Sequence, residues 1–458
     1  MTLDLANKRV LVVGLGRSGS AAAQLCAARG ARVTVTDNRS VAELAAARAE
    51  LPASITRELG GHRRETFTGA DLIVLSPGVP EIPELAAARA GGVAITGELE
   101  LASRFVTAPI VAITGTNGKS TTTTLVGDML HATGRPTFVG GNLGEPLAEA
   151  VGTPAAGAGG FCVVEASSFQ LETVDTFRPR VAVLLNITPD HLDRYDGMDG
   201  YAAAKARVFA AQTAADFAVV NADDPIAVRA AAAAPSRQLQ FSMTRPLPAG
   251  AWLAAGQLMV QLPGQAAESY PADLSWLAGQ RHNQANALAS LLAARLAGAT
   301  PEAARAGLLA FRPLAHRMEL VAEVDEVAYY DDSKGTNVGA VVAALDGFPR
   351  PVILIAGGRD KGGDYGPLAD VMARVGRGAV LIGEAADKIQ AAFQGRVTVA
   401  RAASLEAAVT AAQQHARRGD AVVLSPACSS FDMFRDYAHR AEVFRAAVAR
   451  LAREAKAS

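Results

Sequence analysis

A run of apolar residues leads straight into a glycine-rich turn that ends in Gly-Lys-Ser, and this feature constrains the chain more than any other. The segment reads Val111-Ala-Ile-Thr-Gly-Thr-Asn-Gly-Lys-Ser-Thr121. Its glycines leave backbone N–H groups open to phosphate oxygens, and Lys119 adds a positive charge. A tight turn before a helix would explain the glycines but not the lysine. The segment therefore predicts a strand, a phosphate-binding loop and a helix, with ATP or GTP as the ligand.

The loop also offers a ligand for a metal ion. The hydroxyl of Ser120 or Thr121 can bind the Mg²⁺ that accompanies a nucleoside triphosphate. A standard P-loop would have a further glycine at position 113, where this chain has Ile113, so the loop is a shortened variant. The expected nucleotide-binding residues of the loop are Gly115, Thr116, Asn117, Gly118, Lys119, Ser120 and Thr121.

Length and composition bound the rest of the chain. Its 458 residues suit two to four domains, and we expect three. Cys26, Cys162 and Cys428 are far apart and lack metal-ligand spacing, which indicates a reducing compartment. A formal net charge of −1 gives no basic surface for nucleic acid, and no apolar run is long enough to cross a membrane. With no recognisable signal peptide, we expect a cytoplasmic protein and a monomer.

Strand-like and helix-like segments alternate in three blocks. Residues 1–97 predict a Rossmann-like, doubly wound sheet, residues 98–312 a P-loop ATPase-type mononucleotide-binding domain, and residues 313–458 a second Rossmann-like sheet. We therefore expect an α/β protein with three domains at these boundaries. The predicted strands are 9–14, 31–36, 72–75, 161–164, 181–186, 327–330, 351–356, 378–382, 397–400 and 421–424. The predicted helices include 18–29, 41–51, 121–131 and 283–297, with a β-hairpin around residue 256.

The first block carries a diphosphate-binding pattern. Gly14-Leu-Gly-Arg-Ser-Gly19 follows a strand, and Asp37 ends the next strand. In dinucleotide-binding proteins the glycine turn holds a diphosphate at a helix N-terminus and the acid binds a ribose hydroxyl. NAD or NADP fits this pattern, and so does a nucleotide-linked substrate whose diphosphate lies at the same helix. The turn Ser76-Pro-Gly78 follows a third strand and could add backbone donors.

Polar residues follow two further strands of the second block. Glu165 ends one strand, and the pair Asp190-His191 comes shortly after the other. Since the carboxyl ends of parallel strands meet at one edge, we expect both near the P-loop. Glu165 can offer an oxygen to Mg²⁺ and His191 can bind a second cation or a phosphate; a helix N-terminal acid and a hydrogen-bonded histidine are the alternatives. Asn283 and Asn286 share a helix face and could either read adenine or cap the helix.

The third block places a polar cluster after each of three strands. These clusters are Asp331-Asp-Ser-Lys-Gly-Thr-Asn337, Gly357-Gly-Arg-Asp-Lys361 and Ser425-Pro-Ala-Cys-Ser-Ser-Phe-Asp432, and His316-Arg317 precedes them. Surface polarity would explain any one cluster. Three of them at strand ends predict a rim rich in cations and hydroxyls, which suits an acidic substrate.

Taken together, these motifs resemble those of the Mur ligases, the ATP-dependent amide-forming enzymes of bacterial peptidoglycan synthesis. Six segments occur in the order of that family across nearly the whole chain: residues 115–121, 165–172, 190–195, 282–287, 332–337 and 424–432. The last two resemble the branch of the family that adds D-glutamate. The resemblance implies three α/β domains that bind, in order, a uridine diphosphate substrate, ATP and an amino acid.

The resemblance also implies a role for each matching residue. Lys205, which on its own reads as a solvated lysine, matches the family lysine that carbon dioxide carbamylates; its carbamate has the oxygens that Mg²⁺ prefers. The implied catalytic residues are Lys119, Glu165, His191, Lys205 and Lys334, and the implied ligands of two Mg²⁺ ions are Ser120, Glu165, His191 and Lys205. ATP would also contact Asn283, Asn286, Arg317 and Asp332. The uridine diphosphate substrate would be held by Arg17, Ser18, Asp37, Asn38, Ser76, Gly78 and Asn142, and D-glutamate by Thr336, Lys361, Ser430, Phe431 and Tyr437.

The implied reaction joins D-glutamate to UDP-N-acetylmuramoyl-L-alanine through an acyl phosphate made from ATP. Relatives that add L-alanine, a diamino acid or a dipeptide are the alternatives within the family, and the segments around Lys334 and Ser430 favour D-glutamate. Outside the family, the pattern from Gly14 to Gly19 leaves a nicotinamide dehydrogenase open. A nucleotide-binding regulator without catalysis is the third possibility.

Overall fold

The computed structural model describes residues 3–44, 51–278 and 280–457. The chain divides into two compact units. The first unit consists of residues 1–186, 202–270 and 286–311, and the second of residues 187–201, 271–285 and 312–458. Among the described residues, no helix is both long and apolar enough to cross a membrane.

The N-terminal part of the first unit is a parallel sheet, with the described strands in the order β3-β2-β1-β4-β5. These strands are β1 (Arg9–Val13), β2 (Arg32–Asp37), β3 (Thr56–Leu59), β4 (Leu72–Leu75) and β5 (Ala94–Gly97), and the helices are α1 (Arg17–Ala28), α3 (Arg64–Thr68), α4 (Pro83–Ala90) and α5 (Glu98–Ser103). The predicted strands and first helix of this block are confirmed. Most of the helix predicted over residues 41–51 falls on residues 45–50, outside the described part of the chain.

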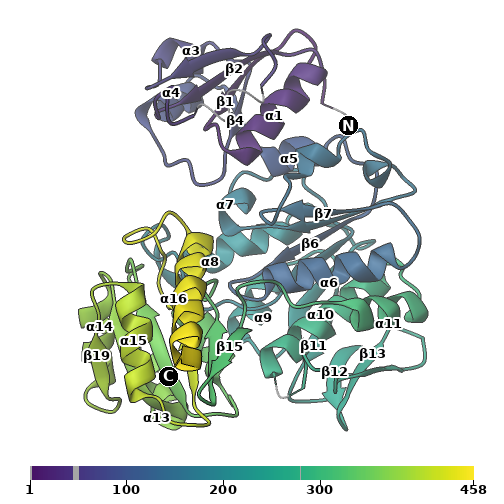
Figure 1. Ribbon diagram of the computed structural model, residues 1–458. Helices are drawn as coiled ribbons and strands as arrows, with labels where there is room; N and C mark the ends of the chain where they lie inside the picture. The colour runs from purple at the N-terminus through teal and green to yellow at the C-terminus, as the bar shows by residue number, and fades with distance from the viewer. Residues whose placement is uncertain (1–2, 45–50, 279, 458) are drawn as a thin grey trace. The chain divides into compact units, whose positions relative to one another are not determined.

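The rest of the first unit is built on a larger sheet, in which the described strands follow the order β14-β13-β12-β11-β10-β9-β6-β8-β7. Its strands are β6 (Ile110–Thr114), β7 (Thr137–Gly141), β8 (Phe161–Glu165), β9 (Val181–Leu184), β10 (Phe217–Asn221), β11 (Arg237–Ser242), β12 (Gly250–Ala254), β13 (Gln257–Gln261) and β14 (Glu268–Pro271). Its helices are α6 (Lys119–His131), α7 (Ser168–Leu171), α8 (Gly197–Ala206), α9 (Pro225–Ala231), α10 (Arg281–Ala297) and α11 (Pro301–Ala310). The hairpin of β12 and β13 turns at Gly256 as predicted. Helix α11 lies alongside α6 (Figure 1).

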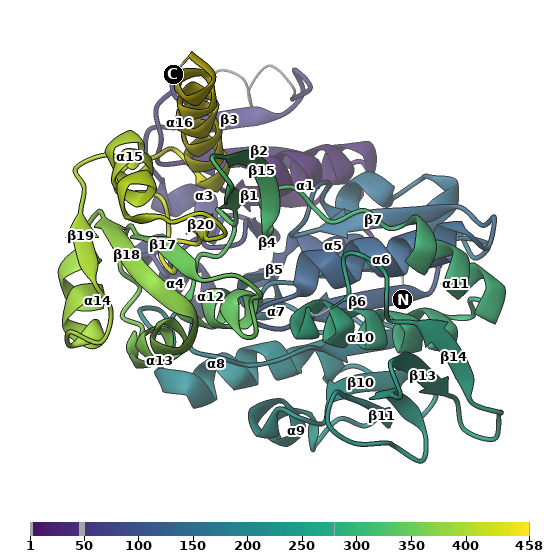
Figure 2. The same ribbon diagram turned by 60° about the horizontal axis from the view of Figure 1, so that its bottom comes forward.

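The second unit is built on a third sheet, with the described strands in the order β15-β16-β20-β17-β18-β19. The strands are β15 (Glu319–Val324), β16 (Val327–Asp331), β17 (Val352–Gly357), β18 (Gly376–Ile382), β19 (Val399–Arg401) and β20 (Ala421–Leu424), and the helices are α12 (Val338–Leu345), α13 (Gly366–Val375), α14 (Ala386–Phe393), α15 (Leu405–His415) and α16 (Tyr437–Ala457). Helices α12 to α14 cover one face and α15 and α16 the other (Figure 2). Strands β17 and β20 are buried throughout, which explains their nearly continuous apolar sequences.

In each sheet, three neighbouring central strands end at the residues that the sequence singled out. Strands β2, β1 and β4 lead to Asp37, Gly14 and Ser76. In the large sheet, the neighbouring strands β9, β6 and β8 lead to the segments that begin at residues 185, 115 and 165. In the third sheet, the neighbouring strands β16, β20 and β17 lead to the segments that begin at residues 331, 425 and 357. Because parallel strands end at one edge, each sheet presents one set of polar loops.

Candidate functional site

The glycine-rich loop between β6 and α6 has the backbone geometry that phosphate binding requires. Gly115 has φ 145° and Gly118 has φ 87°, conformations that residues with a side chain rarely adopt. Gly118 is the N-cap of α6, so the positive end of the helix dipole points at the loop. Lys119 Nζ donates to the carbonyl oxygens of Gly115 and Thr116 at 3.0 and 2.8 Å, which holds the ammonium group over the loop.

Asn186, which was not among the predicted site residues, holds this loop from the end of the neighbouring strand. Its side-chain oxygen accepts the N–H of Asn117 at 2.9 Å, and its amide nitrogen donates to the carbonyl of Asn117 at 3.0 Å. Its backbone carbonyl accepts the N–H of Thr116 at 2.9 Å. These three bonds fix the middle of the loop. An amide side chain at the end of a strand beside β6 was the signal that could have identified it.

Glu165 presents one carboxylate oxygen that no described protein group satisfies. The residue is 3% exposed, and its Oε1 accepts from Asn142 Nδ2 at 2.7 Å. Its Oε2 is buried and has no hydrogen-bond partner among the described residues. A buried carboxylate oxygen is costly unless a donor or a cation meets it. The hydroxyl-bearing Ser120 is also buried, at the start of α6. These oxygen ligands suit a hard cation such as Mg²⁺.

Lys205 and Asn286 both contact the loop. Lys205 is 1% exposed, which rules out the solvated lysine of the simplest interpretation. Its Nζ donates to the carbonyl of Gly115 at 2.8 Å. The Asn286 side chain packs so closely against Gly118 that a Cβ there would lie 2.2 Å from its Oδ1. Asn283 instead donates to the backbone carbonyl of Trp276 and to the side chain of Gln280, so its part in adenine binding stays a prediction.

The turn after β1 is held by Asp37 from the next strand. Asp37 is 4% exposed and accepts the N–H of Leu15 at 2.8 Å as well as the guanidinium of Arg39. Burial alone would raise the pKa of Asp37, but the bonds from Arg39 and Leu15 lower it to about 2. The carboxylate is therefore an ionised brace of the turn. Ser76 adds a bond from its hydroxyl to the carbonyl of Gly14 at 2.7 Å.

The remaining residues predicted to bind the uridine diphosphate substrate lie near these turns. The Arg17 guanidinium donates to the carbonyl of Gly144 at 3.3 Å, two residues from Asn142. Ser18 lies in the first turn of α1, Asn38 is exposed directly after β2, and Gly78 has φ 86°. Their role in binding this substrate stays a prediction.

In the second unit, an ion pair joins two of the predicted site segments. Lys361 Nζ lies 3.1 Å from Asp190 Oδ1, and Asn337 Nδ2 donates to Asp190 Oδ2 at 3.2 Å. Beside this group is a cavity of 340 Å³. Its lining includes Asp190, Asn337, Val338, Val342, Lys361 and Tyr365. His191 follows Asp190 with φ 56° and donates its backbone N–H to Asp190 Oδ1 at 3.0 Å.

The loop after β16 carries Asp332 and Lys334 in contrasting surroundings. Asp332 is buried and accepts the hydroxyl of Ser425. Burial raises the pKa of Asp332 to about 7, against the opposing influence of Ser425 and Arg317. Lys334 Nζ lies 5.3 Å from the centre of the Tyr437 ring, a cation–π contact.

The predicted D-glutamate residues are only partly gathered by the described structure. Lys361 lines the cavity, whereas Thr336, Ser430 and Phe431 are not among its lining residues. Ser430 is buried and Phe431 is 62% exposed. Tyr437 contacts Lys334 and the ring of His316, so it lies on the side of the β16 loop. A D-glutamate role for all five of these residues stays a prediction.

Arg440, absent from the predicted site, joins two of its loops. This arginine is 0% exposed. It donates to the carbonyl of Ser333 in the β16 loop at 2.8 Å and to the carbonyl of Cys428 in the β20 loop at 3.3 Å. Burial lowers the pKa of Arg440 to about 10, with nearby acids opposing the shift. The guanidinium stays charged at neutral pH and ties the two loops together.

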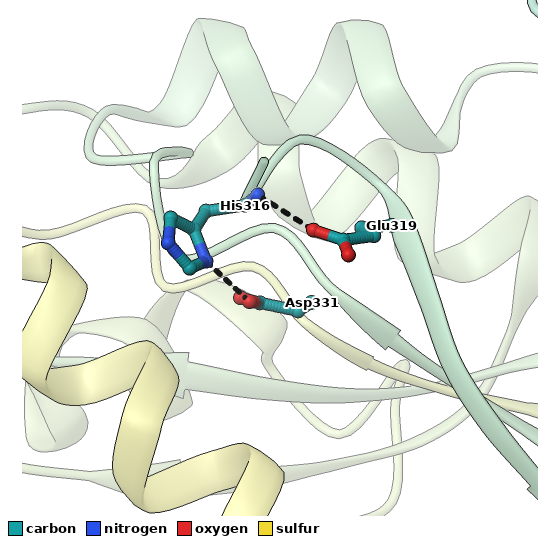
Figure 3. Close-up of side chains that lie close together, drawn as sticks. All are labelled: His316, Glu319 and Asp331. Carbon is teal, nitrogen blue, oxygen red and sulfur yellow. Dashed lines mark hydrogen bonds and ion pairs between the residues drawn. The ribbon is translucent and has the colours of Figure 1, made fainter. Parts of the chain in front are cut away.

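His316, Glu319 and Asp331 form a cluster just before the loop that follows β16 (Figure 3). His316 Nδ1 lies 2.7 Å from Asp331 Oδ2, and the His316 N–H donates to Glu319 Oε2 at 3.1 Å. The three groups are close enough to hold a metal ion. However, the guanidinium of Arg445 bonds both carboxylates, so a cation of the chain itself already offsets part of the negative charge of the cluster. His316 has φ 63°, and the network fixes the bend that precedes Arg317.

Known protein families match this chain along most of its length. The "Mur ligase MurD-like, N-terminal domain" matches residues 8–97, the "Mur ligase middle domain" residues 113–294, and the "Mur ligase, glutamate ligase domain" residues 316–428. The chain belongs to the Mur ligase family. Its three α/β domains are those of this family, and the ATP dependence of Mur ligases agrees with the P-loop between β6 and α6.

Two curated Mur ligases illustrate how close the relationship is. The UDP-N-acetylmuramoylalanine–D-glutamate ligase of Syntrophotalea carbinolica is 49% identical over 97% of this chain and 98% of its own. The enzyme of the same name from Anaeromyxobacter dehalogenans is 50% identical over 96% of this chain and 97% of its own. Among solved structures, a pseudomurein peptide ligase type C from Methanothermus fervidus superposes with a TM-score of 0.62 at 20% identity. It covers 97% of this chain and 100% of its own, and at that identity it supports the fold alone.

Proposed function

We propose that this chain is the ATP-dependent ligase that adds D-glutamate to UDP-N-acetylmuramoyl-L-alanine in peptidoglycan precursor synthesis. The observation that carries this proposal is the near-50% identity to D-glutamate ligases over almost the whole of both chains. The arrangement of the P-loop, with Lys119 held over Gly115 and Lys205 buried against it, supports the use of ATP.

The proposed reaction has two chemical steps. The carboxylate of UDP-N-acetylmuramoyl-L-alanine attacks the γ-phosphorus of ATP, and ADP leaves to give an acyl phosphate. The amine of D-glutamate then attacks the acyl carbon, loses a proton, and expels inorganic phosphate as the amide forms. Lys119 and the N–H groups of the loop offset the charge that develops on the transferred phosphoryl group. Lys334 and Arg317 are the proposed cations of the third domain for the same phosphates.

We further propose that ATP is bound with Mg²⁺, for which the buried and unsatisfied Glu165 Oε2 is the best-supported ligand. Ser120 would share that ion, and His191 and a carbamylated Lys205 would serve a second one. Bound Mg²⁺ neutralises phosphate oxygens and so makes the γ-phosphorus easier to attack. The residues of this chain hold the ion and exclude other ligands.

The Lys205 proposal has its own test. Lys205→Ala should lose most activity and recover part of it when short carboxylates such as formate or acetate replace the carbamate oxygens. The measurement is phosphate release with and without the added acid. Full activity in the unsupplemented variant would remove Lys205 from the mechanism.

The three domains would divide the substrates between them. We propose boundaries at residues 97/98 and 312/313, with the uridine diphosphate end on the first domain, ATP on the second and D-glutamate on the third. Asn142 would lie near the reacting end of the first substrate. We also propose that the enzyme acts in the cytoplasm, where these soluble substrates are found, and that it is a monomer.

The deciding experiment is an amino-acid panel scored by phosphate release, with ATP, Mg²⁺ and UDP-N-acetylmuramoyl-L-alanine present throughout. Only D-glutamate should give sustained turnover. Release with L-alanine, a diamino acid or a dipeptide would identify a different member of the family. If no amino acid gives release, or if NAD is reduced instead, the ligase proposal fails.

A further inference from the structure

The ion pair between Asp190 and Lys361 consists of one carboxylate and one ammonium group, and an amino acid carries a group of opposite charge for each of them. Both residues line the same cavity in the second unit, and Lys361 Nζ lies 3.1 Å from Asp190 Oδ1. The side chain of Asp190 is 8% exposed and that of Lys361 is 21% exposed. A zwitterion such as D-glutamate carries a carboxylate that suits the lysine and an ammonium that suits the aspartate.

An ion pair with one buried and one partly exposed member can exchange partners when a ligand supplies both charges. Breaking it by removing one member leaves an uncompensated charge, which is strongly unfavourable in a low-dielectric site. Replacing both partners at once avoids that penalty, since each charge keeps an opposite charge beside it. Only a ligand with both a carboxylate and an ammonium can do this. A simple dicarboxylate would draw Lys361 away from Asp190 and bring no cation in exchange.

The surroundings of Asp190 favour its staying in place when Lys361 turns to a ligand. Its Oδ2 accepts from Asn337 Nδ2 at 3.2 Å, and its Oδ1 accepts the N–H of His191 at 3.0 Å. These bonds orient the carboxylate independently of the lysine. Lys361, by contrast, follows the end of β17 on a flexible side chain and can move.

Resting on the proposed function, we propose that Asp190 is a specificity-determining residue that receives the ammonium group of the incoming amino acid. Lys361 exchanges Asp190 for a carboxylate of the substrate, and Asp190 exchanges Lys361 for the substrate's ammonium. The pair thus selects for a zwitterion and discriminates against acids that lack the amine.

The test compares D-glutamate with glutarate, the same dicarboxylate without the amine. Dissociation constants are measured by calorimetry on the full-length enzyme with UDP-N-acetylmuramoyl-L-alanine and a non-hydrolysable ATP analogue. The unmodified enzyme should prefer D-glutamate strongly. In Asp190→Asn, D-glutamate should bind about 10- to 100-fold more weakly, since one charge-assisted bond is lost. Glutarate should bind as well as before or better, because Lys361 no longer has a competing carboxylate.

A matched control is Asp370→Asn. Asp370 is an exposed acid of the same unit that does not line the cavity, and it pairs with Arg396 at 2.7 Å. This variant should keep the preference for D-glutamate unchanged. Lys361→Gln should weaken both ligands together, since both need the lysine.

The outcomes separate the inference from the function on which it rests. If Asp190→Asn weakens both ligands equally, Asp190 only supports the pocket and the inference is wrong. An unchanged preference in Asp190→Asn overturns it as well. If the unmodified enzyme binds neither D-glutamate nor glutarate, the proposed function fails first. Circular dichroism and melting of each variant show whether a loss of binding reflects misfolding. If Asp190→Asn misfolds, the conservative variant Asp190→Glu is used in its place. Asp190→Glu should keep the preference for D-glutamate, and loss of that preference would count against the inference.

Discussion

The phosphate loop of the large sheet and the polar rim of the third sheet are built in different ways. In the phosphate loop, the site is formed mainly by backbone conformation: two glycines with positive φ, a helix N-terminus and one lysine lie within five consecutive residues. In the rim, a distant side chain holds the loops: Arg440, on a helix far along the chain, donates to the backbone carbonyls of Ser333 and Cys428. The first kind of site can be recognised from a short sequence, and the second cannot.

The comparison predicts that the largest single effect belongs to the phosphate loop. Lys119→Ala should lower kcat by about 100- to 1,000-fold or more, because it removes a preorganised charge from the phosphoryl group as that group transfers. The melting temperature should change little, since the bonds from the ammonium to the carbonyls of Gly115 and Thr116 lie within the loop itself. Phosphate-release kinetics and calorimetry measure the two. Turnover near that of the unmodified enzyme would refute the assignment of the loop.

In the rim, removing Arg440, which holds two of its loops together, should lower both stability and substrate binding. Arg440→Met keeps the bulk of the side chain but leaves the carbonyls of Ser333 and Cys428 without their donor. Because these charge-assisted hydrogen bonds are buried, their loss should lower the free energy of unfolding by about 2 to 4 kcal/mol. The Michaelis constant for D-glutamate should also rise. Arg450→Met is the control, because Arg450 is an exposed residue of the same helix with only a weak ion pair to Glu454. Equal effects of the two substitutions would show that Arg440 is not a support of the rim.

Much of the fold and of the phosphate loop could be predicted from the sequence, because both depend on local patterns. The apolar strands and the turn at Gly115 to Lys119 are contiguous in the chain. The short, half-exposed strands β3 and β5 were missed, since their four residues carry little apolar signal. The role of Arg440 depends on which loops the third sheet brings together, and no spacing in the sequence encodes that.

Removing Lys361, the lysine of the rim proposed to bind D-glutamate, should have a smaller effect that is confined to this substrate. Lys361→Ala should raise the D-glutamate requirement by about one to two orders of magnitude, the value of a charged hydrogen bond of roughly 1.5 to 3 kcal/mol. ATP affinity should be nearly unchanged. Lys388→Ala is a control of equal charge, since Lys388 is exposed and pairs with the neighbouring Asp360. If ATP affinity falls while the D-glutamate requirement stays the same, the rim serves the nucleotide instead.

The smallest expected effects come from a contrast within one helix of the first unit. Glu98 and Glu100 lie two residues apart on α5, and both are buried. Burial raises the pKa of Glu98 to about 7, and only the N–H of Ala148 opposes it; its Oε2 has no partner among the described residues. Burial acts on Glu100 too, but bonds from Thr176, Asp175 and Arg104 outweigh it and lower the pKa. The same chemical group is therefore protonated at one site and ionised at the other.

These opposite shifts predict opposite pH dependences of stability. The folded pKa of Glu98 lies above its ordinary value of 4.5, so its contribution is complete below pH 4.5 and is lost as pH rises through 7. Glu98→Gln cannot ionise, so it should melt about 2 to 6 °C higher than the unmodified protein at pH 8 and nearly the same at pH 5. Glu100 contributes above pH 4.5 and loses its contribution as pH falls, so Glu100→Gln should melt lower at pH 8, with a deficit that shrinks in acid. Calorimetry checks this for Glu98→Gln at pH 5 and pH 8, and for Glu100→Gln at pH 8 and about pH 3. A stabilising effect of Glu98→Gln that is larger at pH 5 than at pH 8 would show that the Glu98 carboxyl is ionised in the folded protein at low pH.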